Sequence, residues 1–206
     1  MKTINVNEII KTVKELSIEA NYYLPNDVKA AIEEAEKNEK WPIANNILNK
    51  ILENSQIAAT EKMPICQDTG MACVFVDIGQ DVHIIGGSLE EAINEGVRQG
   101  YAEGFLRKSV VKDPLHRVNT NDNTPALIYY NMVPGDKVKI TVAPKGFGSE
   151  NMSRIAMLKP SDGLEGVKNF VLETVRMAGP NPCPPIVIGV GIGGSFDKEI
   201  GRASCR

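Results

Sequence analysis

The sequence predicts an α+β fold, with an N-terminal helical lobe over about residues 1–60 followed by a mixed β-sheet with packed helices. Apolar residues recur at helical spacing through the first sixty positions. Residues 72–78 then alternate in the manner of a strand, and two further β-rich runs follow at 126–132 and 137–143.

The helical lobe is predicted to contain three helices. Ile9, Val13 and Leu16 keep one apolar face on the first, and Leu24-Pro25-Asn26-Asp27 begins the second with Asn26 as its cap. A third helix is expected over residues 44–52. The charged run 33–37 is typical of a solvated helix face.

The remainder alternates between strands and helices. A strand is expected at 82–85, and Ser88-Leu89-Glu90-Glu91 has the form of a capping box that opens a helix to about Tyr101. The turn signal Val133-Pro134-Gly135-Asp136 predicts that its two flanking runs form an antiparallel unit. Helices are expected after Ser149 and over 164–177, and a buried strand over 185–190.

Composition excludes several classes of protein. The net charge of −3 is mixed in sign, so it favours neither nucleic-acid nor membrane-surface binding. No apolar run reaches the roughly 18 residues of a membrane span, and the N-terminus lacks a signal-peptide core. We expect a cytoplasmic protein whose four cysteines are thiols or metal ligands.

Chemistry is concentrated in the stretch Cys66-Gln67-Asp68-Thr69-Gly70. A thiol, an amide, a carboxylate and a hydroxyl stand in consecutive positions, and each would need a partner if it were buried. The stretch suits a metal site or an active-site turn, with Cys66 as ligand or nucleophile. Cys73, inside the apolar alternation that follows, is expected in the core.

Cys183 lies among prolines in Pro180-Asn181-Pro182-Cys183-Pro184-Pro185. Prolines on both sides fix the backbone and are expected to hold the thiol in an extended segment. The alternative is a buried cysteine that acts as a small apolar residue. The segment alone leaves both interpretations open.

Two glycine-rich loops could bind an anion or a nucleotide. Gly146, Gly148 and Ser149 stand in Lys145-Gly146-Phe147-Gly148-Ser149, where amides at a helix start favour an anion, although a plain turn is the alternative. Gly189-Val190-Gly191-Ile192-Gly193-Gly194 matches the dinucleotide fingerprint, but without its βαβ surroundings the match is weak.

Few other side chains are candidates. Arg107, in Leu106-Arg107-Lys108-Ser109, could clamp a carboxylate with its planar fork, or lie on the surface. Arg117 is expected on the surface, His116 in a loop and His83 in a structural role.

Several of these segments, taken in order, resemble one family. They are Ile65–Gly70, Leu106–Ser109, Asn119-Thr120 with Asn123-Thr124-Pro125, Lys145–Asn151, and Cys183-Pro184-Pro185 with Gly189–Gly194. Over about residues 5–198 the chain resembles the α subunit, or N-terminal part, of the iron–sulfur hydro-lyases: class I fumarate hydratase and L(+)-tartrate dehydratase. The alternative is a non-catalytic dinucleotide-binding module that uses Gly189–Gly194.

The resemblance implies a 4Fe–4S cluster with one iron open to substrate, with Cys66 and Cys183 as two of its three ligands. It also implies that Gln67 and Asp68 face the substrate in catalytic roles, with Asp68 in or beside proton transfer. Arg107 and the loop of Gly146, Gly148 and Ser149 would hold the carboxylates of a four-carbon substrate, with fumarate or malate expected first and tartrate next.

The resemblance further implies a β subunit or C-terminal half, and a homo-oligomer. The third cysteine ligand is expected beyond this chain, so we expect the chain by itself to be inactive. Residues 1–198 are expected to form the catalytic domain, and 199–206 a short tail foreign to it.

Overall fold

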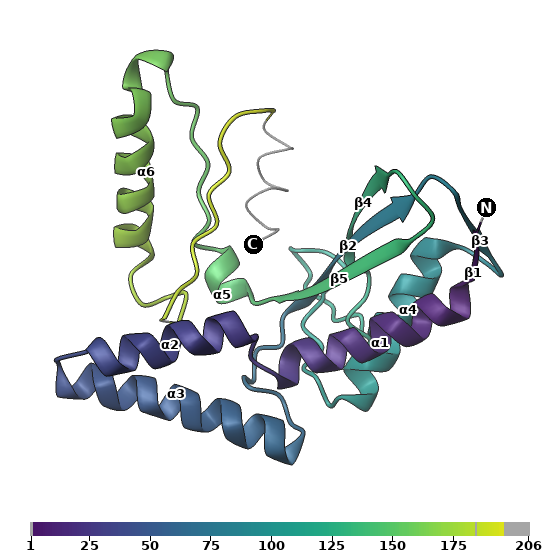
Figure 1. The fold of residues 1–206 in the computed structure, drawn as a ribbon, viewed down its shortest axis with the longest axis horizontal. Coiled ribbons are helices and arrows are strands. Elements are labelled where there is room, and N and C mark those ends of the chain that lie inside the picture. The colour runs from purple at the N-terminus through teal and green to yellow at the C-terminus, as the bar shows by residue number, and fades with distance from the viewer. Residues whose placement is uncertain (1, 184, 196–206) are drawn as a thin grey trace. The chain divides into compact units, whose positions relative to one another are not determined.

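The computed structural model describes residues 2–183 and 185–195, and it has the predicted α+β composition (Figure 1). The chain divides into two compact units, one up to Lys145 and one from Gly146 onward. The expected tail at 199–206 lies outside the described residues. None of the described helices combines the length and apolar content that a bilayer crossing requires.

The first sixty residues are mainly helical, as predicted. The helices are α1 (Val6–Tyr22), α2 (Asn26–Asn38) and α3 (Pro42–Glu61). Asn5 caps α1 by accepting a 2.9 Å hydrogen bond from the amide of Asn7. The predicted cap of α2 is wrong by one position, since Asn26 already lies in the helix and Pro25 precedes it.

Helix α1 packs mainly against α4 (Leu89–Glu103) and against the sheet of the first unit, and much less against α3. Helix α4 begins directly after the predicted cap, Ser88. The two helices approach closely at Gly96, where a Cβ atom would lie 2.7 Å from the Val13 Cβ. Val13 is fully buried in the core of this unit.

The main sheet has β2 (Met71–Gly79) at its centre. Strand β4 (Leu127–Val133) pairs with it in parallel, and β5 (Val138–Lys145) pairs with it in antiparallel orientation. The last two strands run antiparallel to each other, as predicted, but they do not form the predicted hairpin, because β2 lies between them. Two valines of β2, Val74 and Val76, are buried, as expected where a central strand faces the core.

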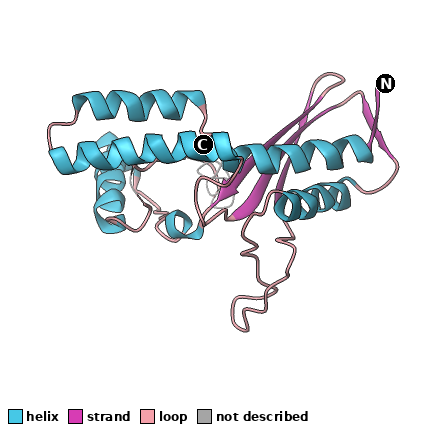
Figure 2. Cartoon of the chain, turned by 90° about the horizontal axis from the view of Figure 1, so that it is seen from below, coloured by secondary structure: helices cyan, strands magenta, loops and turns pink. Residues whose placement is uncertain are grey.

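The loop between β4 and β5 closes around the end of β2. Gly79 donates its amide hydrogen to the Lys137 carbonyl at 2.8 Å, and Gln80 donates to Val133 at 2.9 Å. The predicted strand β3 (Val82–Ile85) follows and pairs in parallel with β1 (Lys2–Asn5), which the sequence analysis missed. A long connection between α4 and β4, drawn as loop in Figure 2, carries much of the candidate site.

The second unit contains the four-residue helix α5 (Phe147–Glu150), a 3-10 turn at Pro160–Asp162 and helix α6 (Gly163–Ala178). The helix predicted after Ser149 is wrong, since α5 ends at Glu150. The segment that follows runs along α6, and Arg154 lies 5.2 Å from the Phe170 ring and 3.6 Å from the Glu173 carboxylate.

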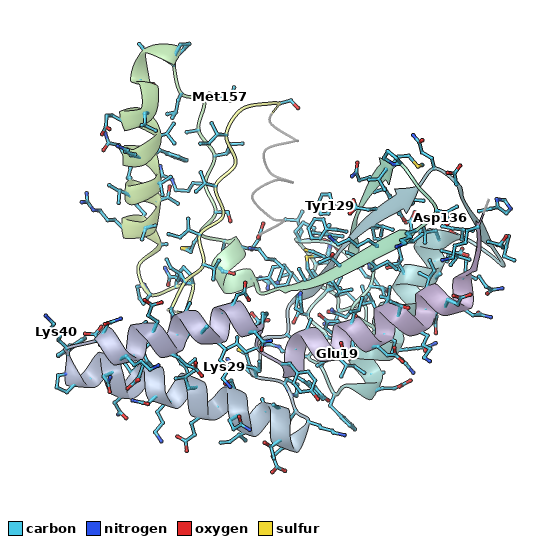
Figure 3. All side chains as sticks on the ribbon, viewed as in Figure 1. Glu19, Lys29, Lys40, Tyr129, Asp136 and Met157 are labelled. Carbon is cyan, nitrogen blue, oxygen red and sulfur yellow. The ribbon has the colours of Figure 1, made fainter. Side chains whose placement is uncertain are left out.

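The buried strand predicted over 185–190 is also wrong. These residues have no strand structure, and Val187 is 76% exposed. No described strand pairs with residues 185–190. An apolar run becomes a buried strand only where it joins a sheet. Other apolar side chains of this unit are exposed too, among them Met157 at 84%, labelled in Figure 3.

Candidate functional site

The stretch Cys66–Gly70 forms a tight turn that leads into β2. The amide of Asp68 donates to the Cys66 sulfur at 3.4 Å, and the amide of Gly70 donates to the Asp68 carboxylate at 3.1 Å. Gly70 has φ 60°, a left-handed conformation that glycine adopts without strain. The turn therefore presents the thiol and the carboxylate from backbone held by its own hydrogen bonds.

The beginning of this turn is anchored to the helical region. The Ile65 amide donates to the Asn21 carbonyl at 2.9 Å, and the Asn54 side chain donates to the Ile65 carbonyl at 2.8 Å. The residue before Cys66 is thus fixed to α1 and α3 at the same time.

The far end of the turn is buried and joined to the segment of Arg107. The hydroxyl of Thr69 donates to the Arg107 carbonyl at 3.0 Å, and the hydroxyl of Tyr101 donates to the Thr69 carbonyl at 2.9 Å. Burial raises the pKa of the Tyr101 hydroxyl well above its usual value, against the opposing effect of hydrogen bonds to the side chains of Asn21 and Asn123. Tyr101 therefore remains a protonated donor.

Arg107 belongs to a segment that pairs with a second part of the long loop. The Asn119 side chain donates to the Lys108 carbonyl at 2.9 Å, and the Thr120 amide donates to the Val110 carbonyl at 3.0 Å. Arg107 is exposed, and among the described residues no carboxylate forms an ion pair with it. Its guanidinium is available for an external carboxylate.

The first unit thus brings together Cys66, Gln67, Asp68 and the backbone of Arg107. Cys66 and Gln67 are exposed and Asp68 is half-buried. The Cys66 sulfur and the Gln67 side-chain oxygen are 3.5 Å apart. A thiol, an amide and a carboxylate therefore stand at one surface beside a segment that carries a free guanidinium.

The second unit brings together the remaining candidates. Ser149 donates its hydroxyl hydrogen to the Gly146 carbonyl at 3.1 Å, which closes the glycine loop. A Cβ atom at Gly148 would lie 3.2 Å from the carbonyl oxygen of Asn181, so this loop lies against the segment of Cys183. Helix α5 is a single turn, so its dipole adds less to anion binding than the sequence analysis assumed.

The sequence analysis predicted an extended segment at Cys183, and this prediction is wrong. Cys183 lies in a turn. Its amide donates to the Pro180 carbonyl at 3.1 Å, and its φ is 61°. Gly179 follows α6 with a φ of 53°, a backbone conformation that favours glycine, and the chain turns there before the cysteine. A left-handed conformation is uncommon for a residue with a side chain, and such positions concentrate at functional sites.

The three described cysteines differ in exposure. Cys66 and Cys183 are exposed free thiols, and Cys73 is buried in β2 as predicted. Within the described ranges no group of three or more His, Cys, Asp and Glu side chains is arranged to hold a metal. Each unit supplies one exposed thiol.

The two histidines, Arg117 and the glycines of 189–194 are the remaining candidates of the sequence analysis. Among the described residues, neither histidine nor Arg117 forms a hydrogen bond or ion pair with the cysteine turn Cys66–Gly70. His83, His116 and Arg117 are exposed, and His116 lies 3.1 Å from the Asp113 carboxylate in the loop before β4. No strand precedes the glycines of 189–194, so the described residues lack the strand-to-helix turn that a dinucleotide fingerprint requires.

A shallow hollow of about 600 Å³ lies elsewhere in the first unit, at the amino-terminal ends of α1 and α4. Glu91, Glu95 and Arg98 line it, but Arg98 is already paired with Glu95 and Asp122, so the described residues leave no free cation there for a dicarboxylate. The cysteine turn has the chemistry that the hollow lacks, so we place the candidate site at the turn.

The sequence analysis did not identify the buried residues that support the turn. The sequence does not distinguish Tyr101 from the other apolar residues that form the buried face of its helix. Asn123 lies in the polar loop of the matched segments, and that loop was its only signal.

Comparisons with known proteins agree with the resemblance. The family model for fumarate hydratase (Fumerase) matches residues 10–204. A Methanocaldococcus jannaschii protein, provisionally named L(+)-tartrate dehydratase subunit alpha, is 48% identical over 94% of this chain and 70% of its own length. The L(+)-tartrate dehydratase subunit alpha of Escherichia coli K12 is 29% identical, and that of the uropathogenic strain UTI89 is 30% identical. The chain spans 64% of the length of each of these two.

Proposed function

The chain belongs to the fumarate hydratase family, and from this premise we propose that it is one subunit of a hydro-lyase that reversibly adds or removes water on a four-carbon dicarboxylate. Fumarate or malate and L(+)-tartrate are the candidate substrates. The names of the relatives make tartrate the first to test. A few pocket contacts, worth about 1–3 kcal/mol, decide such a choice.

The observation that carries the proposal is the direct connection between the cysteine turn and the segment of Arg107. Thr69 and Arg107 are hydrogen-bonded, so the exposed Cys66 and Gln67 and the half-buried Asp68 stand next to a cationic segment. A dicarboxylate needs such a cation to bind, and a carboxylate close to it to take part in proton transfer.

We propose a 4Fe–4S cluster as the cofactor, with Cys66 and Cys183 as two of its ligands. Two features of the chain fit this group. Both thiols are free and exposed, and the Cys66 sulfur already accepts an amide hydrogen, as cluster-ligating sulfurs commonly do. When bound, the cluster would supply a Lewis acid for the substrate hydroxyl. The third thiolate is expected from another part of the complete enzyme.

The chain's own residues have separate tasks in this proposal. Arg107 binds one substrate carboxylate with its planar fork, and the loop of Gly146, Gly148 and Ser149 contributes to holding the other. Gln67 orients the substrate, and Asp68 takes part in moving the proton beside the carboxylate. Fixed donors around the carboxylates are required because negative charge increases there as the proton leaves.

We propose a β subunit or C-terminal half as the partner, because the relatives are named as α subunits and so as parts of an assembly. The rest of the substrate site and the main base would come from that partner. We also propose a homo-oligomer of the assembled enzyme in the cytoplasm. The chain alone is expected to have no turnover.

Anaerobic reconstitution of the complete enzyme with iron and sulfide tests this function. We expect a broad absorbance at the edge of the visible range, and hydration or dehydration of fumarate, malate or tartrate that is lost in air. Binding of a nicotinamide dinucleotide with no cluster would instead favour the dinucleotide-binding module. A loaded cluster with no turnover of any of the three acids would contradict the proposed reaction but not the cofactor.

A further inference from the structure

Asn123 connects the two halves of the candidate site in the first unit. Its side chain is fully buried, and it lies in the loop between α4 and β4 with φ 62°. The side-chain oxygen accepts hydrogen bonds from the amides of Ser109 at 2.7 Å and Val110 at 3.2 Å. The side-chain nitrogen donates to the carbonyl of Gly70 at 3.1 Å.

These three bonds join segments that are far apart in the chain. Gly70 ends the turn of Cys66, 53 residues before Asn123, and Ser109 follows Arg107 by two positions. The Thr69–Arg107 hydrogen bond is a second connection between the same two segments. Two connections fix the distance and the angle between the segments, whereas one would leave them free to rotate.

We propose that Asn123 is a positioning residue that sets the cysteine turn against Arg107. Its catalytic consequence rests on the proposed function. The geometry requires a donor and an acceptor on one short side chain, attached to a left-handed backbone. Asparagine provides both groups and tolerates that backbone better than most residues. A buried amide with three satisfied bonds is a rigid support, because breaking any one of them leaves a buried polar group unpaired.

The informative substitution is Asn123→Asp. It keeps the size of the side chain and an oxygen for the two amides, but it replaces the donor that faces the Gly70 carbonyl with an acceptor. The matched control is Asn121→Asp in the same loop, where Asn121 is also left-handed, with φ 69°, but exposed. Both variants are made in the complete enzyme and reconstituted anaerobically.

We expect turnover per bound cluster to fall about 100-fold in Asn123→Asp, because a displacement of about 1 Å between binding and reacting groups has that effect. Asn121→Asp should retain wild-type turnover per cluster. A residue needed only for folding would lower the amount of folded, loaded enzyme but not its turnover per cluster. Wild-type turnover per cluster in Asn123→Asp would therefore overturn the proposal.

A second measurement does not depend on the reaction. Asn123→Gly keeps the left-handed backbone and removes the hydrogen bonds to Ser109, Val110 and Gly70, together with the interaction with the Tyr101 hydroxyl. In the complete enzyme without cluster, the amides of Ser109 and Val110 should exchange with deuterium about tenfold faster or more than in wild type. Unchanged exchange would overturn the connection itself, whereas faster exchange in an enzyme with no hydro-lyase activity would contradict only the proposed function.

Discussion

The side-chain hydroxyl of Thr69 donates a 3.0 Å hydrogen bond to the backbone carbonyl of Arg107, 38 residues further along the chain. Thr69 is buried, whereas Arg107 is exposed. The bond therefore fixes the backbone of the arginine and leaves its guanidinium free. A cation on a fixed backbone loses less conformational entropy when it binds a carboxylate than one on a mobile loop.

We predict that Arg107→Lys in the complete enzyme lowers kcat/KM for the dicarboxylate about 10- to 100-fold, or about 1.4–2.7 kcal/mol. A lysine keeps the charge but cannot make the paired hydrogen bonds of the guanidinium. Steady-state kinetics together with iron and sulfide analysis provide the measurement, and the cluster content should not change.

Arg117→Lys is the control for this change, since Arg117 is exposed in the same long loop and has no assigned role. It should leave the kinetics unaltered. Equal kinetics in Arg107→Lys and wild type would place Arg107 on the surface, outside the substrate site.

We predict that Cys66→Ala and Cys183→Ala each abolish the cluster in the complete enzyme, whereas Cys73→Ala retains it. The first two thiols are exposed and the third is buried, so only the first two are accessible as ligands. Absorbance spectra and iron content after anaerobic reconstitution distinguish the three variants. Full iron content in either of the first two would remove that cysteine from the ligand set.

The sequence predicted the helices and the central strand well because their patterns are local. Ser88 caps α4 as expected, and β2 has the expected apolar alternation. The strand order was not predictable in this way. Residues 126–143 have the pattern of a hairpin, but the pairing partner of each strand is β2, which lies more than forty residues earlier. Local turn chemistry cannot report such a non-local pairing.

The exposed part of the candidate site was also visible in the sequence, and its buried support was not. Cys66, Asp68 and Arg107 are conspicuous because reactive groups seldom stand so close together. Asn123 and Tyr101 act through burial and through hydrogen bonds to distant backbone, which have no signature in a single sequence. The turn at Cys183 was mispredicted because the chain turns at Gly179, before the prolines.

We predict that Asp122→Asn destabilises the protein at neutral pH by about 2 kcal/mol and has little effect near pH 2. Burial alone would raise the pKa of the Asp122 carboxyl, but hydrogen bonds from Thr124, Arg98 and Thr120 together lower it to about 2. The unfolded chain has a pKa of about 3.9 at this position. The charged carboxylate therefore contributes stability above pH 4, and this contribution is lost as the pH falls toward 2.

Urea unfolding of wild type and Asp122→Asn at pH 7, 4, 3 and 2.5 checks the prediction. The difference in unfolding free energy should shrink steadily below pH 4. Asp136→Asn, in the exposed loop between β4 and β5, serves as the control and should show no such trend. A difference that is the same at pH 7 and at pH 2.5 would show that the charge of Asp122 is not the cause.

We predict that Gly96→Ala destabilises the protein, although alanine is the better helix former. A Cβ atom at this position of α4 would lie 2.7 Å from the Val13 Cβ and 2.8 Å from the Ile10 carbonyl oxygen of α1. The oxygen belongs to the backbone, so the two helices must separate to relieve the contact. Overpacking of this kind costs about 1–3 kcal/mol, which outweighs the gain of about 1 kcal/mol in helix propensity.

The control is Ala102→Gly, at an exposed position on the same helix, which reports helix propensity alone. Because Ala102 lies in the last turn of α4, the change should cost at most about 1 kcal/mol, which corresponds to a fall of at most about 2–4 °C in Tm for a chain of this size. Thermal unfolding of the two variants separates packing from propensity, because propensity alone would make Gly96→Ala more stable than wild type. A rise in Tm for Gly96→Ala would mean that α1 and α4 are not in contact at Gly96. Helix α4, whose Tyr101 supports the cysteine turn, would then pack against α1 in another way.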